Sequence, residues 1–235
     1  MCAVAIAVYL SVALHFKTPS TDWTPPPLVE ATSRQHPSDA TVLPLPVLQM
    51  LRMSTAVQHK ALEARLPLTH PDLDRTTYQR IIQAYYGFHV PLQRLIAGFS
   101  GTEGADPERQ KLPALLKDLH ALGLSDADIQ RLPLCTDLPA LSSHAQLLGI
   151  MYVMEGATLG GQVLRRIIAH RLGIGADNGG EFLDVYGRET GRLWKSFLKS
   201  LADADHPDYN QETVDAACAT FTCFERWLER TGVLL

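Results

Sequence analysis

The strongest constraint on the fold is the spacing of apolar residues, which follows a helical period from residue 48 onward. Apolar side chains three and four positions apart share one face of a helix, whereas a half-buried strand alternates them at every second residue. The chain contains no convincing stretch of such alternation. We therefore predict an all-α fold, a compact multi-helix bundle with helices over 47–65, 75–98, 108–122, 125–131, 140–172, 189–203 and 210–231.

Local signals mark several helix boundaries. Ser125 is predicted as an N-cap because its hydroxyl can accept a hydrogen bond from a first-turn N–H, and Asn210 is a possible N-cap of the last helix. Gly98 and Gly173 are predicted to end their helices. Pro91 lacks an N–H donor, so we expect it to kink the helix that contains it.

The first 45 residues differ in composition from the rest of the chain. Residues 2–16 are apolar and carry no charge before Lys17, but the run is shorter than the ~20 residues that span a membrane. A proline-rich stretch follows over 18–46, and such a composition is typical of disordered linkers. We expect 1–45 to be an apolar run and linker, and 46–235 to be one helical domain.

Composition excludes some classes of function. The chain has 21 Lys and Arg against 25 Asp and Glu, which leaves no surplus of cations to bind nucleic-acid phosphates. The cysteines form no C-x-x-C pair, which argues against a disulfide framework or a cysteine-rich zinc site: they are Cys2, Cys135, Cys218 and Cys223. We expect a cytoplasmic protein, with membrane anchoring or export through residues 2–16 as the alternative.

His59 lies on the apolar stripe of the first predicted helix instead of on its polar face. The stripe follows spacings of four and three along Leu48, Arg52, Thr55, His59, Leu62 and Leu66. A neutral imidazole in this position can offer one ring nitrogen to a metal while the other nitrogen takes a hydrogen bond. The alternative is a hydrogen-bonded histidine of the core.

Four glycines interrupt the long helix predicted over 140–172, at Gly149, Gly156, Gly160 and Gly161. Each glycine inside a helix costs roughly 1 kcal/mol relative to alanine, so the cluster requires a reason. Gly156 and Gly160 are four residues apart and leave a strip of bare backbone on one face. The strip can serve close helix packing, a kink or a flat, bulky ligand, and together with His59 it matches the needs of a haem sandwich.

Two sequence motifs resemble those of one family. Residues 51–63 read L-R-x-x-T-x-x-x-H-x-x-L-E, which is similar to the proximal helix of haem oxygenases. Residues 152–164 read Y-V-x-E-G-x-T-L-G-G-Q-V-L, which is similar to their distal helix. The residues Tyr186, Gly187, Thr190, Gly191 and Trp194 further resemble the bacterial biliverdin-producing branch, including members associated with bacteriophytochromes. The resemblance covers about residues 46–232.

The resemblance implies a set of site residues. His59 would be the proximal ligand of the haem iron, and Gly156 and Gly160 would be the catalytic distal glycines that approach the haem. The other residues implied to bind the cofactor are Arg52, Thr55, Tyr152 and Gly161. Arg52 is expected near a haem propionate, with an exposed surface cation as its alternative, and Tyr152 near the propionate edge, with core packing as its alternative.

The resemblance also implies a reaction. Haem, as both cofactor and substrate, would be cleaved by O₂ to biliverdin, CO and ferrous iron. The electrons would come from a ferredoxin or a flavoprotein reductase. Biliverdin could then serve as the chromophore of a bacteriophytochrome, and recovery of iron is the other use.

One position departs from the family pattern. Many members carry an Asp directly after the first distal glycine, but this chain has Ala157 there. This difference favours the alternative of a non-catalytic haem-binding or haem-transfer protein. A thiamin-degrading hydrolase of a related helical fold requires a nucleophilic cysteine, and no cysteine here lies in a matching motif. Glu155 and Thr158 are nearby candidates for the proton relay. An ordinary carboxylate on the helix surface explains Glu155 at least as well, so we assign it no catalytic role.

Overall fold

The computed structural model describes residues 45–99 and 106–235, and within these ranges no residue forms a strand. The all-α prediction is confirmed. The expectation for 1–45 falls, apart from Leu45, outside the described residues. The α-helices are α2 (Val47–Arg65), α3 (Arg75–Gly98), α4 (Leu112–Ala121), α5 (Asp126–Gln130), α6 (His144–Leu172), α7 (Thr190–Asp203) and α8 (Pro207–Arg230).

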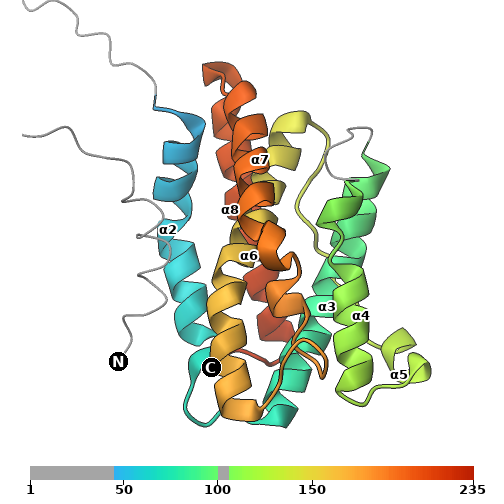
Figure 1. Ribbon diagram of the computed structural model, residues 1–235. Helices are drawn as coiled ribbons and strands as arrows, with labels where there is room; N and C mark the ends of the chain where they lie inside the picture. The colour runs from blue at the N-terminus through green and yellow to red at the C-terminus, as the bar shows by residue number, and fades with distance from the viewer. Residues whose placement is uncertain (1–44, 100–105) are drawn as a thin grey trace, which may run out of the picture. The chain divides into compact units, whose positions relative to one another are not determined.

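Helix α2 packs along α8. The hydrogen bonds between them follow increasing residue number in both helices: Gln58 Nε2 donates to Thr222 Oγ1 at 3.1 Å, and Arg65 pairs with Glu225 at 2.6 Å. The two helices are therefore parallel. Figure 1 shows α2 on one side of the bundle, α3 and α4 on the other, and α6, α7 and α8 between them.

Helix α6 packs on α8 through the first glycine of the cluster. A Cβ on Gly149 would overlap the carbonyl oxygen of Thr213 and would lie 2.8 Å from the Cβ of Ala216. Further toward the helix starts, Ser143 Oγ donates to Glu212 Oε1 at 2.8 Å, so α6 also runs parallel to α8. Close helix packing therefore explains Gly149.

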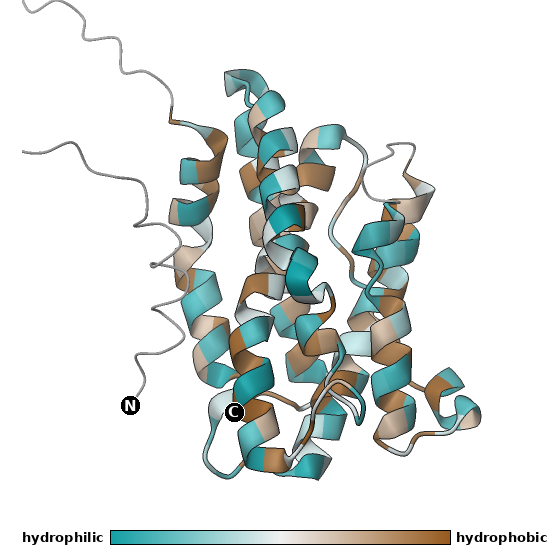
Figure 2. Cartoon of the chain, in the orientation of Figure 1, coloured by the Kyte–Doolittle hydropathy of each residue, from teal (hydrophilic) through white to brown (hydrophobic). Residues whose placement is uncertain are grey.

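Hydrophobic and hydrophilic residues alternate around most helices (Figure 2), as expected for elements that face both core and solvent. Among the described helices, α6 alone has the length and apolarity of a membrane span. Half of its most apolar window is buried within the bundle, which is the behaviour of a core helix.

Three predicted helix starts are wrong. The long helix predicted from residue 140 begins at His144, with Ser143 as its N-cap. The helix predicted from residue 108 begins at Leu112, after a 3₁₀ turn over Pro107–Arg109. Pro113 in its first turn has no N–H to bond a carbonyl four residues earlier, so the helix cannot extend further back. The last helix begins at Pro207 with His206 as its N-cap. Asn210 is buried inside α8, and its Oδ1 accepts from the N–H of His206 at 3.0 Å.

Helix α3 continues through Pro91. The hydrogen bond that is missing at this proline is replaced by one from another segment. Because proline has no N–H, the carbonyl of Gly87 lacks its usual partner within the helix. The backbone N–H of Cys135 donates to this carbonyl at 2.9 Å. A Cβ on Gly87 would overlap the carbonyl oxygen of Pro133 and lie 2.6 Å from Cζ2 of Trp227. Gly87 and Pro91 together therefore attach the segment before α6 to α3.

Gly87→Ala should destabilise the protein by about 2–3 kcal/mol, because the added methyl group meets backbone that cannot move aside. The matched control is Gly98→Ala at the end of the same helix, where a Cβ meets nothing within 4 Å. The control should be neutral or stabilising by up to about 1 kcal/mol. Urea unfolding of both variants measures the difference, and equal losses would contradict this account of Gly87.

Candidate functional site

Three polar residues of α2 follow one border of its buried stripe. At about 100° per residue, Arg52, His59 and Glu63 fall within an arc of about 40°, beside the buried Leu51 and Thr55. Arg52 is exposed, and the side chains of His59 and Glu63 are 37% and 41% exposed. The predicted ligand and the predicted propionate-binding residue therefore share a face, about 10 Å apart along the helix axis.

The imidazole of His59 lies at the junction of α2 and α8. Its ring meets that of Phe221 edge-on, with centroids 5.9 Å apart and an interplanar angle of 89°. Nε2 of His59 is 3.6 Å from a carboxylate oxygen of Glu63. This half-exposed ring has an aromatic neighbour on α8 and a carboxylate neighbour on its own helix, so it can present a nitrogen beyond the buried core.

Thr55 has its polar group engaged within α2. Its hydroxyl donates to the carbonyl of Leu51 at 2.7 Å, and the residue is 3% exposed. The described contacts therefore make Thr55 a buried residue of the α2 stripe, and its expected contact with haem stays a prediction.

The glycine face of α6 is closed at one end and open at the other. Gly149, Gly156 and Gly160 fall within an arc of about 40° of the helix. Gly149 is covered by α8, whereas a Cβ on Gly160 would meet no described atom within 4 Å. Helices α6 and α8 are thus in close contact at Gly149, and the same face of α6 has left that contact by Gly160.

Gly156 and His59 lie at similar heights along α8. Gly149 contacts α8 at Thr213, Ala216 and Ala217. Gly156 lies about 10 Å beyond Gly149 along the axis of α6. On α8, Phe221 lies about 6 Å beyond Ala217 in the same direction, and its ring contacts His59. The fold therefore brings the proximal and distal motifs to one level of the bundle.

Two other predicted site residues of α6 pack against protein. A Cβ on Gly161 would overlap the carbonyl oxygen of Leu183, in the short 3₁₀ helix η4 (Phe182–Asp184). Packing thus requires this glycine, and only its backbone could contribute to a haem site. Tyr152 is buried, with its ring 6.2 Å from that of Trp194, in agreement with the core-packing alternative.

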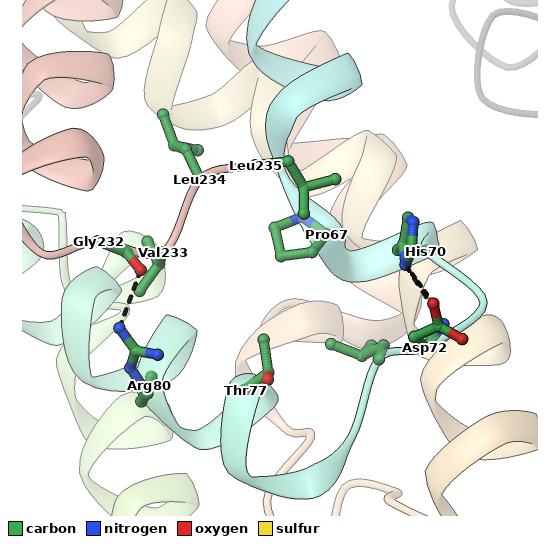
Figure 3. Close-up of a pocket in the computed structure, with 10 residues that line it drawn as sticks. Pro67, His70, Asp72, Thr77, Arg80, Gly232, Val233, Leu234 and Leu235 are labelled. Carbon is green, nitrogen blue, oxygen red and sulfur yellow. Dashed lines mark hydrogen bonds and ion pairs between the residues drawn. The ribbon is translucent and has the colours of Figure 1, made fainter.

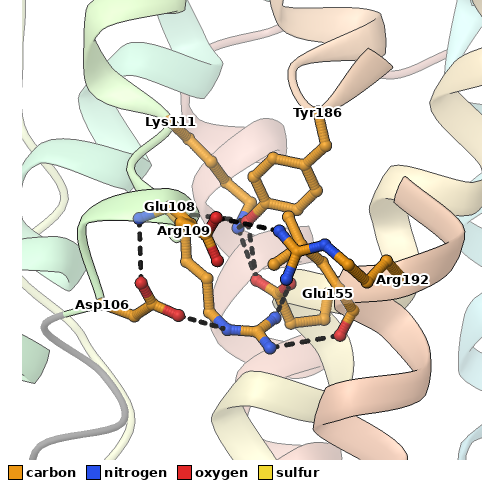
Figure 4. A network of polar contacts seen from close by, with 8 residues as sticks. Asp106, Glu108, Arg109, Lys111, Glu155, Tyr186 and Arg192 are labelled. Atoms are coloured by element: carbon orange, nitrogen blue, oxygen red, sulfur yellow. Dashed lines mark hydrogen bonds and ion pairs between the residues drawn. The ribbon is translucent and has the colours of Figure 1, made fainter. Parts of the chain in front are cut away.

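A buried polar network surrounds Glu155, one position before Gly156 (Figure 4). Glu155 is 1% exposed, so the interpretation as a surface carboxylate is wrong. Its two oxygens pair with Arg109 at 2.5 Å and with Lys111 at 2.7 Å. Tyr186 donates its hydroxyl to Glu155 at 3.0 Å and accepts from Lys111 at 2.6 Å. Arg109 also pairs with Asp106 at 3.4 Å.

Burial sets the protonation of the groups around this network. It lowers the pKa of Lys111, although the carboxylate of Glu155 acts in the opposite direction. It raises the pKa of Tyr186, so the phenol keeps its proton. Burial and the nearby charge of Lys111 lower the pKa of His89 to about 3, and its Nδ1 has no hydrogen-bond partner among the described residues. His89 is therefore a neutral core residue, packed edge-on against Phe182.

Asp118 of α4 holds the segment that covers Gly161. Its two carboxylate oxygens accept hydrogen bonds from the backbone N–H groups of Glu181 and Phe182, each at 2.8 Å. Burial raises the pKa of Asp118 to about 6 despite these bonds. The segment that covers Gly161 is therefore held on α4 by a carboxyl group with a pKa of about 6.

A surface cavity of about 300 Å³ lies elsewhere, next to the C-terminal end of α2 (Figure 3). Arg80 and Gly232 close one side by a hydrogen bond of 2.9 Å, and His70 and Asp72 form a pair at 3.8 Å on another. None of the predicted site residues lines it.

Comparison with known proteins decides the family. The family model for heme oxygenase matches residues 45–230. The chain belongs to the haem oxygenase family. A heme oxygenase from Xanthomonas campestris pv. campestris (strain 8004) is 31% identical over 104 residues, a match that covers 42% of this chain and 57% of that relative. The matched region thus spans little more than half of this haem oxygenase relative.

Solved haem oxygenases share the fold. The structure from Leptospira interrogans aligns with a TM-score of 0.61 at 19% identity, covering 78% of this chain and 98% of that one. Heme oxygenase-1 from the cyanobacterium Synechocystis sp. PCC6803, in complex with heme, aligns with a TM-score of 0.62 at 16% identity, covering 78% and 91%. The predicted haem oxygenase-like bundle is therefore confirmed.

Gly161→Ala should cost about 2–3 kcal/mol of stability, because the methyl group meets the backbone of η4. Gly160→Ala should leave the haem-free protein unchanged or stabilise it by up to about 1 kcal/mol. Thermal or urea unfolding without haem compares the two neighbours. A similar loss in both variants would show that the face at Gly160 is not open.

Asp118 predicts a pH dependence of stability. Its pKa rises from an ordinary 3.8 to about 6 on folding, so its contribution to stability is fully present below pH 4 and is lost as pH rises through 6. The unfolding free energy of wild type minus that of Asp118→Asn should therefore fall by about 2–3 kcal/mol between pH 4 and pH 7. Asp72→Asn, at a carboxylate 90% exposed, is the control. A constant difference would contradict the assignment.

Proposed function

We propose that this chain is a biliverdin-producing haem oxygenase that cleaves haem, its cofactor and substrate, to biliverdin, CO and ferrous iron with O₂ and external electrons. The observation that supports the proposal is that His59 and Gly156 lie at similar heights along α8, with the same face of α6 open at Gly160. A haem needs a nitrogen ligand on one side and room for a flat macrocycle on the other.

The residues present fit haem on both counts. His59 offers an imidazole that is not enclosed by the core, and at Gly160 the space that a Cβ would fill is open. Haem, when bound, supplies the iron at which O₂ is reduced. We propose that His59 ligates this iron and that the backbone at Gly156 and Gly160 faces the ring.

Neighbouring residues of α2 would tune and orient the substrate. A carboxylate next to a metal-ligating imidazole orients the ring and strengthens it as a donor, and we propose this role for Glu63, whose carboxylate is 3.6 Å from Nε2 of His59. Arg52 lies on the same face two turns earlier, where its cation can pair with a propionate. Ala157 offers no acid, so protons would pass through water held by backbone groups that the glycines leave accessible.

The finer assignment is to the bacterial biliverdin-producing branch, as the residues around Tyr186 and Trp194 suggest. The electron donor would be a ferredoxin or a flavoprotein reductase, and the receiver of biliverdin a bacteriophytochrome. We place the reaction in the cytoplasm, where such donors occur. The charge balance of the chain gives no reason to expect nucleic acid as a partner.

An absorption titration with ferric haem tests the proposal. Wild type should bind one haem with a Soret band typical of histidine ligation, and His59→Ala should shift that band and weaken binding. His170→Ala, an exposed histidine at the end of α6, is the matched control and should titrate like wild type. With ascorbate or a ferredoxin and its reductase in air, the wild type should release bile pigment and CO.

Other outcomes separate the alternatives. Saturable haem binding without bile pigment under either electron donor would favour the haem carrier. A Soret band that His59→Ala leaves unchanged would exclude His59 as the ligand. If the wild type bound no stoichiometric haem, both haem functions would be wrong.

A further inference from the structure

The network around Glu155 joins α6 to three segments that are distant in sequence. Arg109 and Lys111 come from the turn before α4, and Tyr186 precedes the 3₁₀ helix η5 (Gly187–Glu189). Arg109 also donates to the carbonyl of Leu193 in α7 at 3.1 Å. Glu155 therefore contacts two distant segments directly, and the network reaches α7 through Arg109.

Stability alone does not explain such a network. Taking charges out of water costs several kcal/mol per ion, and well-packed apolar residues in place of a buried ion pair are often as stable. Ionic hydrogen bonds differ from apolar contacts in direction, because each donor must lie close to its acceptor and in line with it. A network of this kind fixes orientation more strongly than it stabilises the fold.

The network acts where orientation matters to the glycine face. Glu155 precedes Gly156 and points about 100° away from it around α6. Further along, Gln162 Nε2 donates to the carbonyl of Gly187 at 3.2 Å, and Gly161 packs on Leu183. These contacts hold the second half of α6 from the side of η4, η5 and α7, where α8 no longer covers the glycine face.

We propose that Glu155 is a positioning residue, which sets the rotation of α6 about its axis and thereby the place of Gly156 and Gly160 over the haem. The inference rests on the proposed function. Rotation of the helix would move the bare backbone relative to the ring and change which meso carbon is closest to the oxidising centre. Glu155 would thus control the choice of the ring carbon that is cleaved, without touching haem.

Tyr186→Phe tests the proposal without removing a charge. It deletes one hydroxyl, which bonds both Glu155 and Lys111. The matched control is Tyr78→Phe, which deletes a buried hydroxyl that donates to the carbonyl of Gly179 at 2.8 Å, in the segment between α6 and η4 and outside the Glu155 network. The measured quantity is the ratio of biliverdin isomers, which does not depend on how much of the enzyme is folded.

Tyr186→Phe should change the isomer ratio by about threefold or more, because small misplacements of reacting groups alter rates by up to about 100-fold. Tyr78→Phe should leave the ratio as in wild type, although it also removes a buried hydrogen bond. Glu155→Gln should act like Tyr186→Phe and more strongly. If it fails to fold, Tyr186→Phe alone decides. Equal ratios in wild type, Tyr186→Phe and Tyr78→Phe would overturn the proposal.

Hydrogen exchange of the haem-free protein gives a second readout. Exchange over residues 150–162 should rise about tenfold in Tyr186→Phe, the factor that a lost buried hydrogen bond gives in a local opening equilibrium. Tyr78→Phe should leave this segment protected. If exchange rises only in Tyr186→Phe while the wild type makes no bile pigment, the proposed function fails but the tethering of α6 stands. Unchanged exchange in Tyr186→Phe would mean that the network does not hold α6.

Discussion

The rest of the structure depends on the approach of the α6 backbone to α8 at Gly149. Only a residue without a Cβ allows the helix to come this close to Thr213 and Ala216. Because α2 packs along the same α8 in the same direction, this one contact places both motif-bearing helices in a common register. Three helical turns later, at Gly160, the same face of α6 is no longer covered by α8. The glycines thus allow close packing at Gly149 and leave open backbone at Gly160.

A second constraint acts on the part of α6 that α8 does not cover. Where α6 no longer contacts α8, other contacts must fix its rotation about its own axis. Glu155 and Gly161 supply that hold, the first through ionic hydrogen bonds and the second through contact with Leu183. Asp118 extends the hold into α4 by capping η4. The position of the open backbone at Gly160 is therefore fixed in two ways. Polar contacts of Glu155 act on another side of α6, and close packing acts at Gly149.

Sequence patterns predicted these features to different extents. The helical period and local caps such as Ser125 were sufficient for the all-α fold, because they act between neighbours in the chain. They failed at Asn210, since the proline at 207 offered a better helix start than the amide side chain. The sequence could not show that Glu155 is buried, because its partners Arg109 and Lys111 lie 46 and 44 positions away. The motifs located His59 and the glycines, but only the fold separates Gly149 and Gly161, which pack, from Gly160, which is open.

In the proposed haem oxygenase, the same arrangement would let a distal face work without an acid. Between Gly156 and Gly160 the sequence has no titratable side chain, and the hydroxyl of Thr158 donates to the carbonyl of Glu155 at 2.7 Å. Glu155 itself is turned away and paired with two cations, so its negative charge is kept off the glycine face. A haem bound there would meet bare backbone and whatever water that backbone holds. The role expected of an acid at position 157 would then pass to water held by the backbone, and proton delivery would depend on the rotation of α6.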